Sequence, residues 1–346
     1  MSSAGKATKK QEVGDHGPGK AAIAPDRVTH MTVDAEYAGQ RLDNFLMRLA
    51  RGVPKSHVYR IVRSGEVRIN RARASADQRV QAGDELRIPP MRTSVRPPTR
   101  VAPADMPPVL FEDEHLMALD KPPGLAAHGG SGIAFGLIER VRAARPNQPF
   151  LELAHRLDRE TSGVLLLAKS RRALTRLHAA MRDGEVDKRY LTLVAGIWHN
   201  TRQHVRAPLH KYVTGGGERR VSVDDAQGRE AHTTFNRIRQ FASADLTFTL
   251  LEAELHTGRT HQIRVHLAHL GTPIVGDDKY GDFELNKRVA GSAFVPPLRR
   301  MFLHAASVAF AHPVGGQSLR IESPLADDCA SFLAGLSEKR PRARAI

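Results

Sequence analysis

His155-Arg156-Leu157-Asp158-Arg159-Glu160-Thr161-Ser162-Gly163 stands directly before the apolar run Val164-Leu165-Leu166-Leu167-Ala168. A run of this length and composition predicts a buried strand. We therefore expect the polar segment to be a loop at the start of a core strand, where a rigid scaffold can present a reactive group. A solvated turn, in which Asp158 bonds its own backbone, is the simpler interpretation. The charge pattern alone leaves both interpretations open.

The charge balance of the whole chain favours a polyanionic partner. The 346 residues include 52 Lys+Arg against 37 Asp+Glu, a net charge of +15, which is typical of proteins that bind nucleic acid. Cys329 is the single cysteine, which excludes a disulfide framework and a thiolate metal site. No stretch approaches the roughly 18 consecutive apolar residues of a membrane span, and no apolar segment follows the N-terminal lysines. We expect a soluble, cytoplasmic protein.

Composition shifts along the chain predict five segments. Residues 1–27 are rich in Gly, Lys and Ala without periodicity, which is typical of a disordered basic leader. Prolines mark residues 91–108 as an extended linker. The remaining ranges are a small domain at 28–90, a large domain at 109–337 and a basic tail at 338–346.

The small domain contains two predicted helices followed by two predicted strands. Leu42, Phe45, Leu46 and Leu49 have helical spacing, Pro54 ends that helix, and Ser56 is the expected cap of the next one. The segments 39–43, 54–56 and 63–70 resemble the S4 RNA-binding domain. The resemblance implies RNA contact through a basic stripe, although each side chain taken alone is equally consistent with a solvated helix face. The stripe consists of Arg51, Lys55, Arg60, Arg63 and Arg68.

In the large domain, predicted strands and helices are intermixed without a regular βαβ rhythm, which predicts an α+β fold. Gly129-Gly130-Ser131-Gly132 precedes a helix but lacks the Lys-Ser/Thr ending of a P-loop and the spacing of a dinucleotide fingerprint. The histidines at 256, 261, 266 and 269 are not accompanied by cysteines or an HExxH pattern. We therefore expect neither a nucleotide site nor a metal site.

Four segments, in this order, resemble the motifs of the RluA family of RNA pseudouridine synthases. The opening nonapeptide, at 155–163, is similar to the family signature. Residues 121–125 with His128, 188–191 and 257–264 are similar to its first, tyrosine and arginine motifs. Residues 129–139 and 276–286 are most similar to a subgroup that modifies large-subunit ribosomal RNA.

The resemblance implies a fold, an activity and a set of site residues. The implied fold is a pseudouridine synthase fold with a mixed, largely antiparallel central sheet behind an S4-like domain. The implied activity is that of an isomerase, an intramolecular transferase that converts uridine to pseudouridine in 23S ribosomal RNA. Asp158 is implied as the catalytic carboxylate and Arg259 as its catalytic partner. Tyr190 is implied as a further catalytic residue that stacks on the uracil and assists a proton transfer, and Leu303 is implied to pack beneath the base. Arg156 is implied to fill the space of the flipped nucleotide.

The reaction itself limits what else the protein needs. Uridine isomerisation breaks one glycosidic bond and forms a carbon–carbon bond without oxidation, so no cofactor is required in principle. We expect a monomer whose partner is large-subunit ribosomal RNA, either free or in an assembling subunit, with Arg159 as a further contact.

One alternative function is a catalytically silent RNA-binding assembly factor, which the presence of Asp158, Tyr190 and Arg259 disfavours. Another is an N-glycoside hydrolase that releases uracil.

Overall fold

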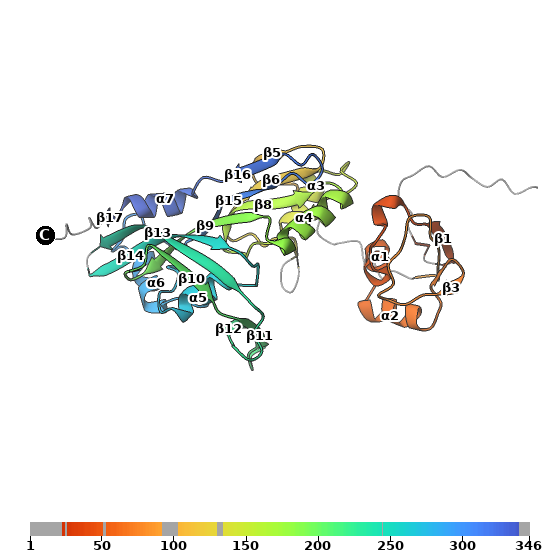
Figure 1. Ribbon diagram of the computed structural model, residues 1–346, viewed down its shortest axis with the longest axis horizontal. Coiled ribbons are helices and arrows are strands. Elements are labelled where there is room, and N and C mark those ends of the chain that lie inside the picture. Colours follow the sequence, from red (N-terminus) through yellow and green to blue (C-terminus); the bar gives the residue numbers. More distant parts are fainter. Residues whose placement is uncertain are drawn as a thin grey trace, which may run out of the picture. The chain divides into compact units, whose positions relative to one another are not determined.

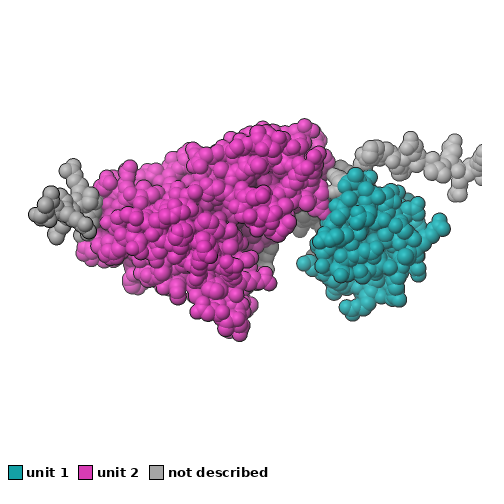
Figure 2. Space-filling model, viewed as in Figure 1, with its two compact units in different colours: residues 1–100 teal, residues 101–346 magenta. Residues whose placement is uncertain are grey.

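The computed structural model describes residues 23–24, 26–50, 53–91, 103–129, 134–243 and 245–338. The chain divides into two compact units, residues 1–100 and 101–346 (Figure 2). Most of the predicted leader, linker and tail lies outside the described residues, as does Arg51. The domain boundaries expected from composition therefore stay predictions. Within the described part of the chain, no helix is both long enough and apolar enough to cross a bilayer.

The first unit is built from helices with one apolar face that pack on a small antiparallel sheet. In α2, Val58, Ile61 and Val62 are buried, because they recur at helical spacing. Pro54 is the cap of this helix and Ser56 lies inside it, so the predicted Ser56 cap is wrong. The described strands have the order β1-β4-β2-β3. The elements are β1 (Thr29–Thr32), η1 (Ala35–Tyr37), α1 (Leu42–Leu49), α2 (Lys55–Arg63), β2 (Arg68–Ile69), β3 (Ala72–Arg73) and β4 (Glu85–Ile88).

The second unit is organised around one large sheet (Figure 1). Its described strands run in the order β10-β13-β14-β9-β15-β8-β6-β5, with β16 on β15, β17 on β13 and β7 on β8. Among these pairings only β8 with β15 is parallel, which confirms the predicted mixed, largely antiparallel sheet. Its strands are β5 (Val109–Glu112), β6 (Leu116–Lys121), β7 (Glu152–Leu153), β8 (Ser162–Ala168), β9 (Asp187–Ala195), β10 (Arg202–Arg206), β13 (His232–Ser243), β14 (Leu246–Leu255), β15 (Leu303–Ala311), β16 (Ser318–Glu322) and β17 (Ser337–Glu338).

Helices cover both faces of this sheet, which explains the unbroken apolar run in β8. Leu165 and Leu167 share a buried cluster with residues of α3 and α5. Val164 and Leu166 point the other way, into a cluster with α4. α6 and α7 share a further cluster with β9 and β14. The helices are α3 (Leu137–Ala144), α4 (Arg171–Asp183), α5 (Gln262–His269), α6 (Phe283–Ala290) and α7 (Asp327–Ala334).

A separate hairpin, β11 (Leu209–Val213) with β12 (Arg219–Val223), projects from the body of the second unit beside α5 (Figure 1). It carries Lys211, Arg219 and Arg220 on its two strands. The glycine-rich segment 215–217 forms its turn, where Gly217 has a φ of +80°. The hairpin therefore adds a basic projection close to the helix that follows residues 257–261.

Candidate active site

The polar segment before β8 forms a loop that several contacts hold against the sheet. The backbone N–H of Thr161 donates to the carbonyl of Asp158 at 3.2 Å, which closes a turn. His155 Nε2 accepts a hydrogen bond from the backbone N–H of Leu166 at 3.1 Å. Burial lowers the pKa of His155 to about 4, so the ring stays neutral at physiological pH. His155 thus holds the loop against β8 and is uncharged at physiological pH.

Gly163 lets this loop enter the sheet next to β15. The two strands pair in parallel with Gly163 opposite Ala305. Gly163 has a φ of +104°, and a Cβ on it would lie 2.2 Å from the carbonyl oxygen of Ala305. A residue with a side chain would therefore clash with backbone and be strained as well. The glycine that ends the opening nonapeptide is thus a packing requirement of the strand behind the site.

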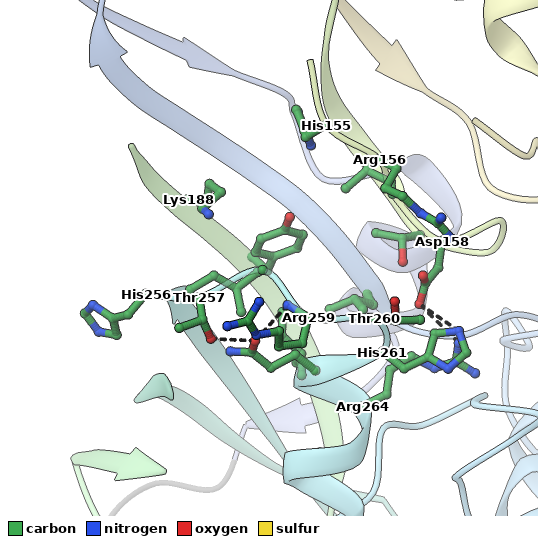
Figure 3. Close-up of a pocket in the computed structure, with 18 of the residues that line it drawn as sticks. His155, Arg156, Asp158, Lys188, His256, Thr257, Arg259, Thr260, His261 and Arg264 are labelled. Atoms are coloured by element: carbon green, nitrogen blue, oxygen red, sulfur yellow. Dashed lines mark hydrogen bonds and ion pairs between the residues drawn. The ribbon is translucent and has the colours of Figure 1, made fainter. Parts of the chain in front are cut away.

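Asp158 faces a cleft of about 660 Å³ in the second unit (Figure 3). Its carboxylate lies 3.2 Å from Nη1 of Arg264 and 3.8 Å from Nε2 of His261. The Asp158 side chain keeps 20% of its surface exposed, so a substrate in the cleft can reach it. The cleft is lined by residues of the nonapeptide, of α4, of β9 and of the 255–264 segment, together with Leu303.

Arg264 is fixed before any substrate binds. Its Nε and Nη2 donate to the two oxygens of Asp277 at 2.7 Å each, and its guanidinium lies 5.1 Å from the centre of the Tyr280 ring. Burial works to lower the pKa of Arg264, but the hydrogen bonds and charges of Asp277 and Asp158 outweigh burial and raise it. The arginine is therefore a permanent cation. It stabilises negative charge on Asp158.

The partner of Asp158 is thus Arg264, and the expectation that Arg259 pairs with it is wrong. The Nε of Arg259 donates to the backbone carbonyl of Glu230 at 3.0 Å, and its side chain is exposed. Arg259 still lines the same cleft, and Figure 3 shows it apart from the group formed by Asp158, His261 and Arg264. The role predicted for Arg259 in catalysis stays a prediction.

One signal in the sequence could have identified Arg264. The neighbours Ile263, Val265 and Leu267 are apolar, and α5 is buried nearly all around. An arginine in the middle of such a helix needs a buried acidic partner, because an unpaired buried charge is strongly unfavourable. Asp277, which is 1% exposed, supplies that partner thirteen positions later.

Gln262 holds the chain that carries Arg259 and His261. Its Oε1 accepts from the Thr257 hydroxyl at 2.7 Å and from the Arg259 backbone N–H at 3.0 Å. Its Nε2 donates to the carbonyl of His232 at 3.0 Å and to the Thr233 hydroxyl at 2.9 Å. One buried amide thereby satisfies four partners and fixes the turn ahead of α5.

Tyr190 and Leu303 belong to the apolar lining of the cleft. Both are buried, with 7% and 4% of their surface exposed, and both line the cavity. Burial, and then the negative charge of Asp158, raise the pKa of the Tyr190 hydroxyl, so it keeps its proton. Tyr190 and Leu303 therefore offer an uncharged surface in the same cleft as the carboxylate.

The predicted RNA contacts lie on exposed surfaces of their own units. Arg156 is exposed and lines both the main cleft and a neighbouring cavity of about 420 Å³. Arg159 lines that second cavity and pairs with Glu160 at 3.0 Å. In the first unit, four of the five predicted side chains are described, and all four are exposed: Lys55, Arg60, Arg63 and Arg68.

The histidines near the cleft bond to neighbouring protein groups. His266 contacts the Thr233 hydroxyl and the Ala207 carbonyl, each at 3.0 Å, and His256 contacts the Thr234 hydroxyl at 2.9 Å. Among the residues that the structure describes, no group of three His, Cys, Asp or Glu side chains is arranged to hold a metal ion.

A carboxylate held by a buried arginine, beside a neutral tyrosine in an open cleft, defines a site for nucleophilic or acid–base chemistry. Comparison with known proteins identifies the class. The family model described as RNA pseudouridylate synthase matches residues 115–269, and the S4 domain model matches residues 40–86. The S4 model lies within the first unit and the synthase model within the second.

Several curated relatives share most of the chain. Ribosomal large subunit pseudouridine synthase C of Escherichia coli (strain K12) is 46% identical over 320 residues, which are 90% of this chain and 97% of that protein. The protein of the same description from Pasteurella multocida (strain Pm70) is 44% identical over 320 residues, 90% of this chain and 95% of that one. The chain therefore belongs to the family of RNA pseudouridine synthases, which confirms the resemblance drawn from its four motifs.

Solved structures agree on the fold. Human RNA Pseudouridylate Synthase Domain Containing 1 is 22% identical, with a TM-score of 0.55 over 70% of this chain and 92% of that one. Human RNA Pseudouridylate Synthase Domain Containing 4 is 24% identical, with a TM-score of 0.53 over 67% and 94%. The pseudouridine synthase fold expected from the sequence is confirmed.

Proposed function

We propose that this protein isomerises uridine to pseudouridine in large-subunit (23S) ribosomal RNA, with Asp158 as the catalytic carboxylate. The observation that carries the proposal is the ion pair of Asp158 with the buried Arg264 at the wall of the cleft. The large-subunit substrate is supported by the relatives that share about nine-tenths of the chain, since each is described as a ribosomal large subunit enzyme.

The reaction moves uracil from its N1 link to a C5 link on the same ribose. The C1′–N1 bond breaks, a C1′–C5 bond forms, the C5 proton leaves and N1 gains a proton, so atoms and electrons balance without a co-reactant. An ionised carboxylate can serve either by attacking the sugar or by abstracting a sugar proton. Asp158 is placed for either role because Arg264 stabilises its charge and the cleft leaves it accessible.

The target uridine has to leave its stack to reach Asp158, at a cost of a few kcal/mol. Tyr190 and Leu303 would receive the uracil ring on the apolar wall of the cleft. Arg156, exposed at the rim, would occupy the space that the nucleotide vacates. Arg159 and Arg259 would contact the flanking RNA. Phosphate contacts of this kind offset the unstacking and make affinity depend on salt.

The two compact units suggest a division of labour. We assign RNA docking to the S4-like domain, residues 28–90, through Arg51, Lys55, Arg60, Arg63 and Arg68, and we assign catalysis to residues 109–337. The exposed positions of the four described side chains support the first assignment. We further propose that the protein acts as a monomer in the cytoplasm, on free ribosomal RNA or on an assembling subunit.

The Asp158→Asn variant tests the proposal. Asparagine is nearly isosteric, so we expect this variant to fold and to bind RNA normally but to release no tritium from RNA labelled at uridine C5. The charge-matched control is Asp225→Asn, an exposed position in the loop after β12, which should retain full activity. Product from Asp158→Asn would refute the catalytic assignment.

The same assay separates the two alternative functions. Free uracil among the products would favour an N-glycoside hydrolase. RNA binding without product from the wild-type protein, on large-subunit RNA isolated from a strain that lacks it, would favour an assembly factor.

A further inference from the structure

His261 lies between the carboxylate of Asp158 and the hydroxyl of Tyr280. Its Nε2 is 3.8 Å from Oδ2 of Asp158, and its Nδ1 is 2.8 Å from the hydroxyl of Tyr280. Figure 3 shows the His261 ring directed at the carboxylate from the same side as Arg264. The ring is therefore in contact with the proposed catalytic group on one edge and with a phenol on the other.

The hydrogen bonds around Tyr280 determine which nitrogen of His261 carries the proton. The Tyr280 oxygen accepts a hydrogen bond from the backbone N–H of Val221 at 3.0 Å. Burial raises the pKa of Tyr280, so its oxygen also keeps one proton to donate. His261 Nδ1 is the acceptor that lies within reach of that proton. A neutral imidazole with an accepting Nδ1 must carry its hydrogen on Nε2, and Nε2 faces Asp158.

The backbone of His261 is held in this orientation. His261 has a φ of +56°, which is unusual for a residue with a side chain. Such a conformation is strained and persists only where surrounding contacts enforce it. Gln262, with its four hydrogen bonds, supplies that enforcement on the adjacent residue. The hydrogen bonds of Gln262 therefore hold His261 in a strained backbone conformation that places its ring next to Asp158.

We propose that His261 is a positioning residue for the reaction: it donates its Nε2–H to Asp158, and Tyr280 sets the tautomer that makes this possible. The inference rests on the proposed catalytic role of Asp158. The present 3.8 Å separation is longer than a hydrogen bond. Catalytic hydrogen bonds are often long in unbound enzymes and shorten when substrate binds. Together with Arg264, the imidazole then directs two N–H groups at one carboxylate.

The same phenol connects this contact to the β11–β12 hairpin. Val221, which donates to Tyr280, lies in β12. Next to Tyr280, the Nζ of Lys279 donates to the backbone carbonyl of Arg219 at 2.6 Å and pairs with Glu218 at 2.7 Å. The position of the basic hairpin therefore determines where the Tyr280 hydroxyl lies, and through it the orientation of His261.

Two replacements of His261 separate a donated hydrogen bond from mere packing. The amide nitrogen of glutamine reaches the position of Nε2, whereas that of asparagine reaches only the position of Nδ1. We expect His261→Asn to lower kcat at least tenfold and His261→Gln to retain most of it, with RNA affinity and thermal unfolding unchanged in both. His269→Asn, on an exposed position of the same helix, is the control. Equal losses in the two His261 variants, or no loss in His261→Asn, would overturn the proposal.

The tautomer of His261 can be measured on the protein without RNA. In protein with isotope-labelled histidine, the side-chain nitrogen NMR spectrum should show His261 protonated on Nε2 and unprotonated on Nδ1. Tyr280→Phe should move that signal toward a mixture of tautomers and lower kcat without changing KM. A proton on Nδ1 in the wild type would overturn the proposal. These spectra do not depend on catalysis, so failure of the Asp158 assignment would appear separately, as activity in Asp158→Asn.

Discussion

At the scale of single residues, the site depends on which arginine pairs with the Asp158 carboxylate. Arg264 is 6% exposed and bridges Asp158 and Asp277, whereas Arg259 is exposed and bonds a backbone carbonyl. An exposed arginine is screened by water and contributes little, while a buried one both orients and stabilises its partners. The geometry therefore gives the two arginines different expected effects.

We expect Arg264→Met to destabilise the protein by about 3–5 kcal/mol, because it leaves a buried carboxylate without its partner. The double variant Arg264→Met with Asp277→Leu should recover only part of this stability, because the backbone N–H groups of Lys279 and Tyr280 lose the Asp277 carboxylate as their acceptor. It should recover none of the activity, since Asp158 still lacks its cation. Arg259→Met should unfold like the wild type. Denaturant unfolding and tritium release measure the two effects. A fully active double variant would contradict the role given to Arg264.

The hydrogen bond between His155 and the backbone of Leu166 makes the stability of the protein depend on pH. Its pKa is lowered from 6.5 to about 4 by burial, and its Nε2 accepts a bond that a proton would break. The unfolded chain therefore binds more protons between these two values, and the stability present above pH 6.5 is lost as pH falls toward 4. We expect the wild type to lose up to roughly 3 kcal/mol more than His155→Gln across this window. Equal losses of unfolding free energy in the wild type and in His155→Gln between pH 6.5 and pH 4 would contradict this expectation.

At the scale of elements, the parallel pair β8–β15 lies in the interior of the sheet and places the loop at the start of β8. Gly163 and Gly184 both have positive φ, but a Cβ at Gly163 meets the Ala305 carbonyl at 2.2 Å, while a Cβ at Gly184 meets nothing within 4 Å. Gly184→Ala should therefore cost only the conformational penalty, about 1–2 kcal/mol. Gly163→Ala should cost clearly more and also lower activity. Equal losses of unfolding free energy in the two variants would show that β8 can move away from β15.

At the scale of the whole molecule, the two units have separate buried cores, so they should be separable. We expect residues 101–346 alone to fold and to keep the geometry around Asp158, but to bind large-subunit RNA more weakly than the full chain. The salt dependence of binding should also be smaller, because the slope falls by about 0.9 for each phosphate that the protein no longer neutralises. Filter binding at several salt concentrations measures both. Equal affinities and slopes would contradict the docking role of the S4-like domain.

Patterns that depend on near neighbours in the chain were predictable. The spacing of apolar residues predicted α1, α2 and β8, because burial of one helix face or of both strand faces has a fixed period. Ser170 and Gly184 lie at the two ends of α4, where the Ser170 hydroxyl accepts from the Ala173 N–H and Gly184 has a left-handed backbone, and both residue types are typical of these positions. Ser56 was misplaced as a cap, because the helix already begins at the residue after Pro54.

The sequence alone thus determined the family, the α+β class and Asp158 as the carboxylate of interest, since these follow from ordered motifs and local periodicity. Only the tertiary structure decided which cation meets that carboxylate and which tautomer its neighbouring histidine adopts. Arg264 is 106 positions from Asp158, and Val221 is 59 positions from the phenol of Tyr280. Contacts across such distances depend on how the sheet brings β8, α5 and the hairpin together. Electrostatic and hydrogen-bond energies depend on separation in space rather than in sequence.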